Sequence, residues 1–228
     1  MAYPAAVAML LTRAWAAHGG APPAPASGVR VLHVGCGVGA ATFELCRSFA
    51  GVVGVDSSEP LIRHARVLQH HGQFGYDRVT EGMLTASALA RVPEGSNRGR
   101  ATFVVGDACA LSPEVLQAGP YGIVLLDMCL TKLRQPQAAL AAAAAALAPG
   151  GLLIITSHND WDAAHTPRNS WLGGFKMNGE HMSTKHMLAY AMARTFALLE
   201  TADLTRCTQS TERRLCVDIV QATVWQRK

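Results

Sequence analysis

The decisive stretch is Val31-Leu32-His33-Val34-Gly35-Cys36-Gly37-Val38-Gly39, which runs from an apolar segment into a glycine-rich turn. Residues 29–34 are mainly apolar and β-branched, as expected of a parallel strand that is buried on both faces. Residues 38–49 carry apolar side chains at helical spacing, so the glycines lie at a strand-to-helix turn. Because side chains are missing there, the backbone can approach a ligand closely, and the first N–H groups of the helix point at it.

A second apolar run, residues 51–55, ends in Asp56. A carboxylate at the end of the next strand can accept both hydroxyls of a ribose, so the turn and Asp56 together predict a site for an adenosyl group. Two cofactors fit this site. Gly35-x-Gly37-x-x-Ala40 satisfies the dinucleotide fingerprint, whereas Gly35-x-Gly37-x-Gly39 is the form usual in methyltransferases that use S-adenosylmethionine. A tight turn that binds nothing is the third interpretation.

Length and composition favour one domain, residues 1–228, with a sizeable core. The six cysteines include no C-x-x-C pair, which favours a reducing, cytoplasmic compartment and argues against a metal site. The net charge of +4 is modest, and the basic residues form no run beyond Arg213-Arg214, so nucleic acid is not an expected partner. Since no apolar stretch of about 18 residues is free of charge and proline, no membrane span is predicted.

Strand and helix patterns alternate along most of the chain. Within residues 1–27, the apolar pattern predicts a helix that packs on the domain, and a proline-rich connector follows it at 21–27. Between residues 72 and 100 the alternation lapses into glycine, charge and a polar loop, and an insertion of this length is more often a lid than an idle loop. The rest predicts parallel strands at 29–34, 51–55, 102–105, 122–126 and 151–156, helices at 38–49, 59–70, 137–147 and 183–198, and an antiparallel pair near 200–205 and 215–225.

Four segments resemble the motifs of class I S-adenosylmethionine-dependent methyltransferases. They are VLHVGCGVG at 31–39, VVGVD at 52–56, FVVGDA at 103–108 and LAPGGLLIIT at 147–156. The resemblance implies a Rossmann-like α/β fold, a seven-stranded mostly parallel sheet with an antiparallel last strand and helices on both faces. A dinucleotide dehydrogenase usually repeats its mononucleotide half and adds a substrate domain, and this chain is too short for both.

The same resemblance implies a set of cofactor-binding residues. Asp127, at the end of the fourth strand, would face the amino-acid end of S-adenosylmethionine. His33 stands where these enzymes generally carry an acid within the first strand, so one acidic contact is expected to be missing. The other implied contacts are Gly35, Cys36, Gly37 and Gly39 to methionine and ribose, Asp56 and Ser57 to the ribose hydroxyls, and Asp107 and Ala108 to the adenine edge.

A second resemblance concerns Ser157 to Gly174, SHNDWDAAHTPRNSWLGG, which leaves the fifth strand at the edge where open α/β sheets bind ligands. With Ala222-Thr223-Val224-Trp225, it is similar to the C-terminal methyltransferase domain of ovothiol synthases. That family methylates the π nitrogen of 5-mercaptohistidine to give ovothiol A. The resemblance implies a small thiol-histidine acceptor. The iron-dependent sulfur-inserting domain of the family does not accompany these residues, so either a separate sulfoxide synthase is a partner in the pathway or the chain is a domain of a longer protein.

The reaction would be an in-line displacement at a sulfonium methyl, in which orientation of the two reactants supplies most of the rate. Stacking on the acceptor ring is expected from Trp161 or Trp171, and pairing with its carboxylate from Arg168 or Lys176. The expected partners of a ring N–H or of the ammonium are Asp160 or Asp162, and the candidate proton acceptors are His158 and His165. Three other functions stay open: a methyltransferase for another small acceptor such as a phenol or a carboxylate, a catalytically silent binding module, and a dehydrogenase.

Overall fold

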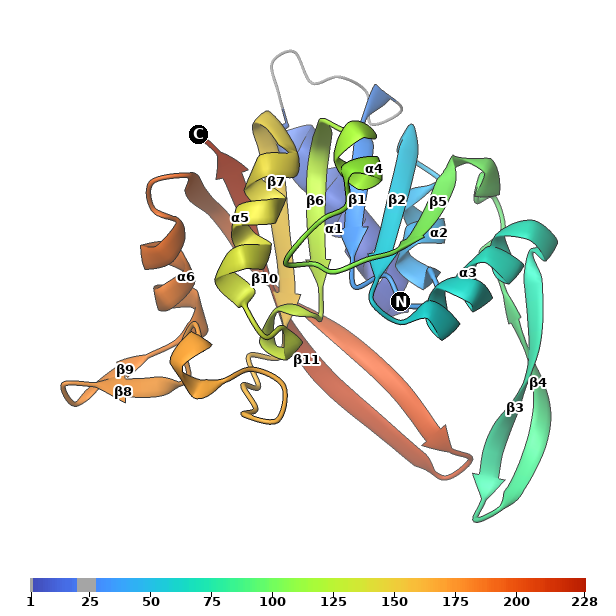
Figure 1. Ribbon diagram of the computed structural model, residues 1–228. Coiled ribbons are helices and arrows are strands. Elements are labelled where there is room, and N and C mark those ends of the chain that lie inside the picture. The colour runs from blue at the N-terminus through green and yellow to red at the C-terminus, as the bar shows by residue number, and fades with distance from the viewer. Residues whose placement is uncertain (1, 20–27) are drawn as a thin grey trace.

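The computed structural model describes residues 2–19 and 28–228 (Figure 1). Its centre is a seven-stranded sheet in the order β10-β11-β7-β6-β1-β2-β5. The neighbours from β7 to β5 pair in parallel, whereas β11 is antiparallel to both β7 and β10. The strands are β1 (Arg30–Val34), β2 (Gly51–Asp56), β5 (Ala101–Val105), β6 (Tyr121–Asp127), β7 (Leu147–Ser157), β10 (Phe196–Thr211) and β11 (Arg214–Arg227). The predicted fold class is therefore confirmed.

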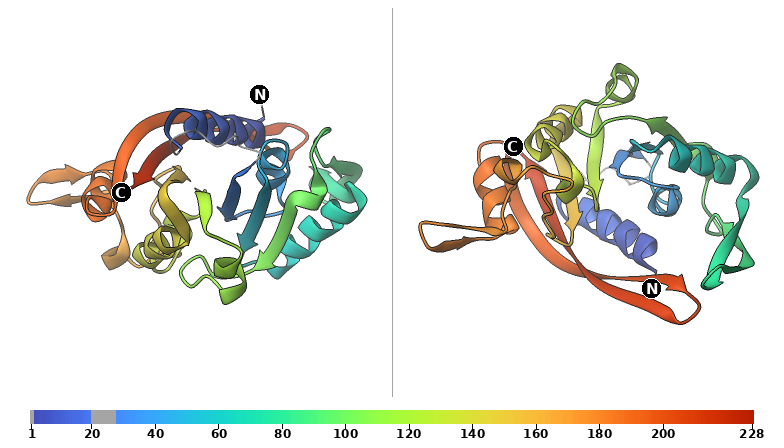
Figure 2. Two further views of the ribbon diagram at one scale, coloured as in Figure 1. Left: turned by 90° about the horizontal axis from the view of Figure 1, so that it is seen from above. Right: turned by 60° about the horizontal axis from the view of Figure 1, so that its bottom comes forward.

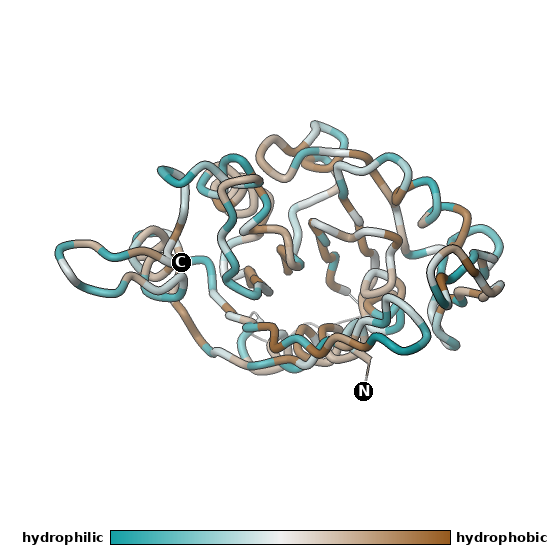
Figure 3. The backbone as a smooth tube through the Cα atoms, turned by 90° about the horizontal axis from the view of Figure 1, so that it is seen from below, coloured by the Kyte–Doolittle hydropathy of each residue, from teal (hydrophilic) through white to brown (hydrophobic). Residues whose placement is uncertain are grey.

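Helices cover both faces of the sheet, because successive residues of each buried strand point to opposite sides. Val31 packs in one core with α1 (Tyr3–His18), α2 (Ala40–Leu45) and α3 (Glu59–His71). Its neighbour Leu32 packs in a second core with α4 (Pro113–Gln117), α5 (Pro136–Ala146) and α6 (Thr184–Met192). Figure 3 shows that the most hydrophobic parts of the chain gather along the central strands and the helix faces against them.

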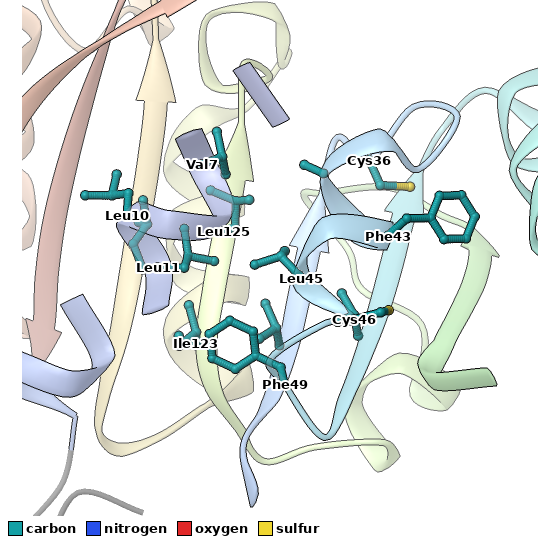
Figure 4. Close-up of a cluster of buried hydrophobic side chains, with 14 of the residues drawn as sticks. Val7, Leu10, Leu11, Cys36, Phe43, Leu45, Cys46, Phe49, Ile123 and Leu125 are labelled. Carbon is teal, nitrogen blue, oxygen red and sulfur yellow. The ribbon is translucent and has the colours of Figure 1, made fainter. Parts of the chain in front are cut away.

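The N-terminal helix packs as its apolar face predicts. Val7, Leu10 and Leu11 of α1 are buried and lie against Ile123 and Leu125 of β6 (Figure 4). Burying one such side chain contributes about 1.5–3 kcal/mol, so α1 belongs to the core of the domain. The predicted connector at 21–27 lies outside the described residues. Among the residues that are described, no helix has the length and apolar character needed to cross a membrane.

Two predicted helices end earlier in the structure, and two elements were missed. The helix after the glycine turn covers only Ala40–Leu45, because Gly39 has a φ of 88° at its start and Phe49 turns back into the core. The last helix ends at Met192, and Phe196 already pairs with Arg227 in the sheet. The short helix α4 and the hairpin of β8 (Phe175–Met177) and β9 (Glu180–Met182) were not predicted at all.

The segment 72–100 is not the irregular loop that its composition suggests. It forms an antiparallel hairpin of β3 (Gln73–Glu81) and β4 (Leu84–Arg91), followed by the short 3₁₀ helix η2 (Arg98–Arg100). Its residues are exposed or half-buried, so the strands lack the continuous buried apolar runs by which the parallel strands were predicted. Arg78 of this hairpin donates to Gln209 of β10 at 3.3 Å, which ties the insertion to the far end of the domain.

The last two strands continue beyond the sheet as a curved hairpin (Figures 1 and 2). Only residues 221–226 of β11 pair with β7, whereas β10 and β11 stay paired with each other from Leu204 and Val220 outwards. We call residues 204–220 the hairpin arm. Because the arm leaves the sheet at the edge where β7 ends, it carries side chains from the C-terminal part of the chain toward the ends of the parallel strands.

Candidate functional site

A cavity of about 490 Å³ lies at the carboxyl ends of β1, β2, β5 and β6. This is the point where the strand order reverses, since β2 and β5 lie on one side of β1 and β6 on the other, and open α/β sheets bind ligands there. The volume is within the range of small-molecule sites. Its lining is Val34, Gly35, Val55, Asp56, Ser57, Leu61, Gly106, Asp107, Ala108, Asp127, Met128, Cys129, Lys132, Leu133 and Arg206.

The glycine turn has the backbone that its sequence requires. Gly35, Gly37 and Gly39 have φ values of 81°, 54° and 88°, in the region that side-chain-bearing residues rarely adopt. At Gly35 a Cβ atom would lie 2.6 Å from the backbone carbonyl oxygen of Asp127. Gly35 also donates its N–H to the carbonyl of Val55 at 2.8 Å. The turn therefore presses against both neighbouring strands at the rim of the cavity.

Asp56 connects the turn to the next strand. One carboxylate oxygen accepts the N–H of Gly37 at 2.9 Å and the other accepts that of Ser58 at 2.9 Å. Because a carboxylate has about four acceptor positions, both oxygens can still accept a ribose hydroxyl. Asp56 is thus oriented by the backbone and retains the capacity that the sequence prediction assigned to it.

The structure brings most of the sequence-predicted cofactor residues to one cavity. Its lining contains Gly35, Asp56, Ser57, Asp107, Ala108 and Asp127. The remaining three, Cys36, Gly37 and Gly39, shape the turn beside it. Burial raises the pKa of the Cys36 thiol, and the charge of Asp56 raises it further, so Cys36 acts as an uncharged packing residue.

Asp127 is held in a buried polar network. Its Oδ1 accepts the hydroxyls of Tyr3 and Thr156, each at 2.6 Å, and its Oδ2 lies 3.3 Å from Nε2 of His33. Nδ1 of His33 lies 2.8 Å from the hydroxyl of Thr42. Burial raises the pKa of Asp127, but the contacts with His33, Thr156 and Tyr3 outweigh burial and leave the pKa below its usual range. The carboxylate is therefore ionised at neutral pH.

The expectation that one acidic contact to the cofactor is missing at His33 stays a prediction. The structure adds that His33 pairs with Asp127, at the end of the neighbouring strand. Sequence reasoning treated the two residues separately because 94 positions divide them. It also missed Tyr3, which reaches Asp127 from α1. The Tyr3 contact spans 124 positions, so no local pattern signals it.

Three further lining residues had no signal in the sequence. Burial, with the charges of Asp127 and Asp56, raises the pKa of Cys129 to about 12, so its thiol is neutral. Lys132, in the short 3₁₀ helix η3 (Leu130–Lys132), and Arg206, on the hairpin arm, are the two cations of the lining. They offer two separate sites for carboxylates.

Three of the sequence-predicted acceptor residues form a cluster of their own. The rings of Trp161 and Trp171 stack with centroids 6.3 Å apart, and Arg168 lies 5.9 Å from the centroid of Trp171. The indole of Trp161 donates to Thr184 at 2.9 Å, and that of Trp171 donates to the carbonyl of Thr166 at 2.8 Å. With both N–H groups engaged in the fold, this cluster supports the loop after β7.

The other predicted acceptor residues divide into two groups. Asp162 accepts the N–H of Ala164 and is exposed, and His165 and Lys176 are exposed as well. Among the described residues that line the cavity, neither these three nor the members of the tryptophan cluster are found. The structure does not bring them to the site because the loop after β7 turns away along α6.

His158 and Asp160 lie in a different place, beside the hairpin arm. Nδ1 of His158 is 4.0 Å from a carboxylate oxygen of Asp160, and Nε2 is 3.8 Å from one of Asp218. The same Asp218 oxygen is 3.4 Å from the guanidinium of Arg206, which lines the cavity. The hydroxyl of Thr131 orients Asp160 at 3.3 Å. These two predicted residues therefore connect to the cavity through Arg206 and Asp218, which sequence reasoning missed.

The strand order, the antiparallel β11 and the cavity at the reversal point define the Rossmann-like fold of class I methyltransferases. Residues 3–196 match the family described as a methyltransferase domain, and the chain belongs to that family. Fold and family imply S-adenosylmethionine as the methyl donor. The chain is thus a methyltransferase, which decides against the dehydrogenase and the silent module. No curated protein matches the sequence.

Several solved structures are similar to this one. The N-methyltransferase NodS from Bradyrhizobium japonicum WM9, in complex with S-adenosyl-L-homocysteine, is 15% identical over 97% of this chain and 86% of its own, with a TM-score of 0.56. A SAM-dependent methyltransferase from Methanosarcina mazei is 18% identical over 88% and 92%, with a TM-score of 0.57. Magnesium protoporphyrin IX methyltransferase from Synechocystis PCC 6803, with bound SAM, is 16% identical over 98% and 79%, with a TM-score of 0.55.

Proposed function

We propose that this methyltransferase transfers the methyl group of S-adenosylmethionine to the π nitrogen of 5-mercaptohistidine, giving ovothiol A. The observation that carries the proposal is the resemblance of residues 157–174 and 222–225 to the ovothiol-synthase methyltransferase domain. The proposal is supported by the location of His158 and Asp160 from that segment, which lie beside a cation that lines the cavity.

We assign the cofactor to the cavity with its adenine toward Asp107 and Ala108 and its ribose on Asp56 and Ser57. The glycine turn and Asp127 then face the methionine part, and Lys132 is the partner of its carboxylate. The free acceptor positions on Asp56 and the apolar lining from Val34, Val55 and Leu61 fit an adenosyl group. When bound, S-adenosylmethionine supplies an electrophilic methyl group on a sulfonium.

The acceptor needs orientation more than activation. A free histidine ring titrates near pH 6.5, so at neutral pH a ring nitrogen is largely available as a nucleophile. Alignment of two bound reactants can supply about 7–11 kcal/mol of the barrier. We assign His158 to take up the ring proton, with Asp160 and Asp218 holding the imidazole of His158 between them. The tryptophans, Asp162 and Arg168 then act on the acceptor only through the loop that carries His158.

We also propose the setting of the reaction. All six cysteines are free thiols, which fits a reducing cytoplasm. 5-Mercaptohistidine requires a sulfur atom to be attached to the histidine ring first, so we propose that a sulfoxide synthase acts upstream in the pathway.

The test is methyl transfer from methyl-labelled S-adenosylmethionine to a panel of 5-mercaptohistidine, histidine and catechol, with the product examined by NMR. We expect transfer to the π nitrogen of 5-mercaptohistidine, and little transfer to histidine or catechol. The variant Asp56→Ala, which lacks the ribose-facing carboxylate, should abolish the signal and serves as the control. Brisk transfer to catechol with none to 5-mercaptohistidine would contradict the proposal and favour another small acceptor.

A further inference from the structure

We propose that Arg206 and Asp218 bind the α-carboxylate and the α-ammonium group of an amino-acid acceptor. The two residues form a cross-strand pair on the hairpin arm, with 3.4 Å between the guanidinium and the carboxylate. The proposal deepens the function proposed above, because it names the part of the acceptor that this end of the site recognises.

The register of the arm turns this pair toward the site. Arg206 pairs directly with Asp218, and both are half-buried. The adjacent pairs in the ladder, Thr205 with Ile219 and Cys207 with Val217, are exposed, because alternate residues of a strand face opposite sides. The inner face of the arm is thus polar where it meets the cavity.

The pair lies at the reacting end of the cavity and away from the adenosyl end. Arg206 lines the cavity together with Asp127 and Lys132, on the hairpin arm that leaves the sheet beside β7. Asp127 ends β6, whereas Asp107 follows β5 at the far edge of the sheet. A group bound by Arg206 therefore lies beyond the methionine end of the cofactor, where an acceptor must approach the methyl group.

The contacts of the pair leave donors and acceptors unused. A guanidinium has five N–H donors, and Arg206 uses one of its terminal nitrogens for Asp218. Nε2 of His158 lies 3.8 Å from the carboxylate of Asp218, is buried, and has no hydrogen-bond partner among the described residues. A buried nitrogen without a partner is unfavourable. An ion pair on a hairpin arm by itself contributes little to stability, so neither feature is explained by folding.

An α-amino acid matches these groups. Its carboxylate can take two parallel N–H bonds from a guanidinium, the geometry that arginine favours, and its ammonium group can donate to the carboxylate of Asp218. The side chain of the amino acid would then extend into the cavity past His158. Since Lys132 remains for the carboxylate of the cofactor, the two cations of the lining account for the two carboxylates of the reactants.

The experiment measures binding of three probes to the complex of the full chain with S-adenosylhomocysteine by calorimetry. Histidine has both charged groups, histamine lacks the carboxylate, and imidazolepropionate lacks the ammonium group. Wild type should bind histidine at least about tenfold more tightly than either analogue. Arg206→Met should weaken the binding of histidine and of imidazolepropionate about tenfold and leave the binding of histamine unchanged. Asp218→Asn should weaken the binding of histidine and of histamine and leave the binding of imidazolepropionate unchanged.

Two variants on exposed positions of the same hairpin provide controls. Arg213→Met and Asp203→Asn remove the same charges outside the inner face and should leave all three affinities unchanged. The proposal is overturned if wild type fails to prefer histidine. It is also overturned if Arg206→Met weakens the binding of S-adenosylhomocysteine and not that of histidine, because Arg206 would then bind the cofactor.

The outcomes separate this inference from the proposed function. If 5-mercaptohistidine is not methylated but histidine binding depends on Arg206 and Asp218, only the proposed acceptor is wrong. If 5-mercaptohistidine is methylated and Arg206→Met leaves its KM unchanged, only the present inference is wrong.

Discussion

Replacing His33 with aspartate would introduce the acid that the resemblance to class I methyltransferases implies for the first strand, and the structure predicts that the variant is less stable than wild type. His33 is 1% exposed and its Nε2 lies 3.3 Å from Oδ2 of Asp127. In the variant His33→Asp two carboxylates would face each other in a buried site. The loss of stability should be reversed by the double variant His33→Asp/Asp127→Asn, in which a single acid remains and lies on β1 instead of β6.

The size of the effect follows from charge and hydrogen bonding. Two charges about 5.5 Å apart repel by about 3 kcal/mol at an effective dielectric constant of about 20. Loss of a hydrogen bond to a charged group costs about 1.5–3 kcal/mol. The free energy of unfolding of His33→Asp should therefore be lower than that of wild type by about 4–6 kcal/mol at pH 7. This is a large share of the stability of a typical domain.

The pH dependence separates repulsion from a simple packing defect. In wild type the lowered pKa of Asp127 stabilises the fold above the unfolded-state value near 3.9, and this contribution is lost as the pH falls through the folded-state value. In the variant, repulsion raises the pKa of one carboxylate. As the pH falls, that group is protonated and the repulsion that destabilises the fold is removed. The deficit relative to wild type should thus be larger at pH 7 than at about pH 5.

The assay is urea unfolding followed by tryptophan fluorescence at both pH values, with calorimetry of S-adenosylhomocysteine binding. His181→Asp, at an exposed position of β9, makes the same exchange away from Asp127 and should change the free energy of unfolding by about 0.5 kcal/mol or less. The reasoning is refuted if His33→Asp is as stable as the control. It is equally refuted if the double variant is no more stable than His33→Asp alone.

Three further predictions concern the same site. Asp56→Asn should weaken S-adenosylhomocysteine binding about 10- to 100-fold in calorimetry, because the amide cannot accept both backbone N–H groups and the ribose. Tyr3→Phe should lower the free energy of unfolding by about 1.5–3 kcal/mol at pH 7 by removing a donor to a buried carboxylate, whereas Tyr190→Phe, at a residue that is 83% exposed, should change little. Gly35→Ala should lower the thermal midpoint more than Gly37→Ala, since both have positive φ but only at Gly35 would a Cβ meet backbone, at 2.6 Å.

Local patterns in the sequence were enough to predict the sheet and the glycine turn. Each parallel strand is a short apolar run that is buried on both faces, and each glycine of the turn occupies a φ that few other residues adopt. Asp56 was predictable for the same reason, because it is the last residue of β2. The hairpin at 72–100 escaped detection because its strands are exposed or half-buried and carry no continuous apolar run.

The chemistry of the site was decided by contacts between distant segments. Asp127 and His33 are 94 positions apart, and Tyr3 reaches the same carboxylate across 124 positions. Arg206 comes to the cavity only because the hairpin arm leaves the sheet next to β7. Periodicity reports how a segment is buried, not which distant side chain faces it. The sequence by itself therefore determined the fold, the glycine turn and Asp56, whereas only the tertiary structure assembled the buried carboxylate network and the pair of Arg206 and Asp218.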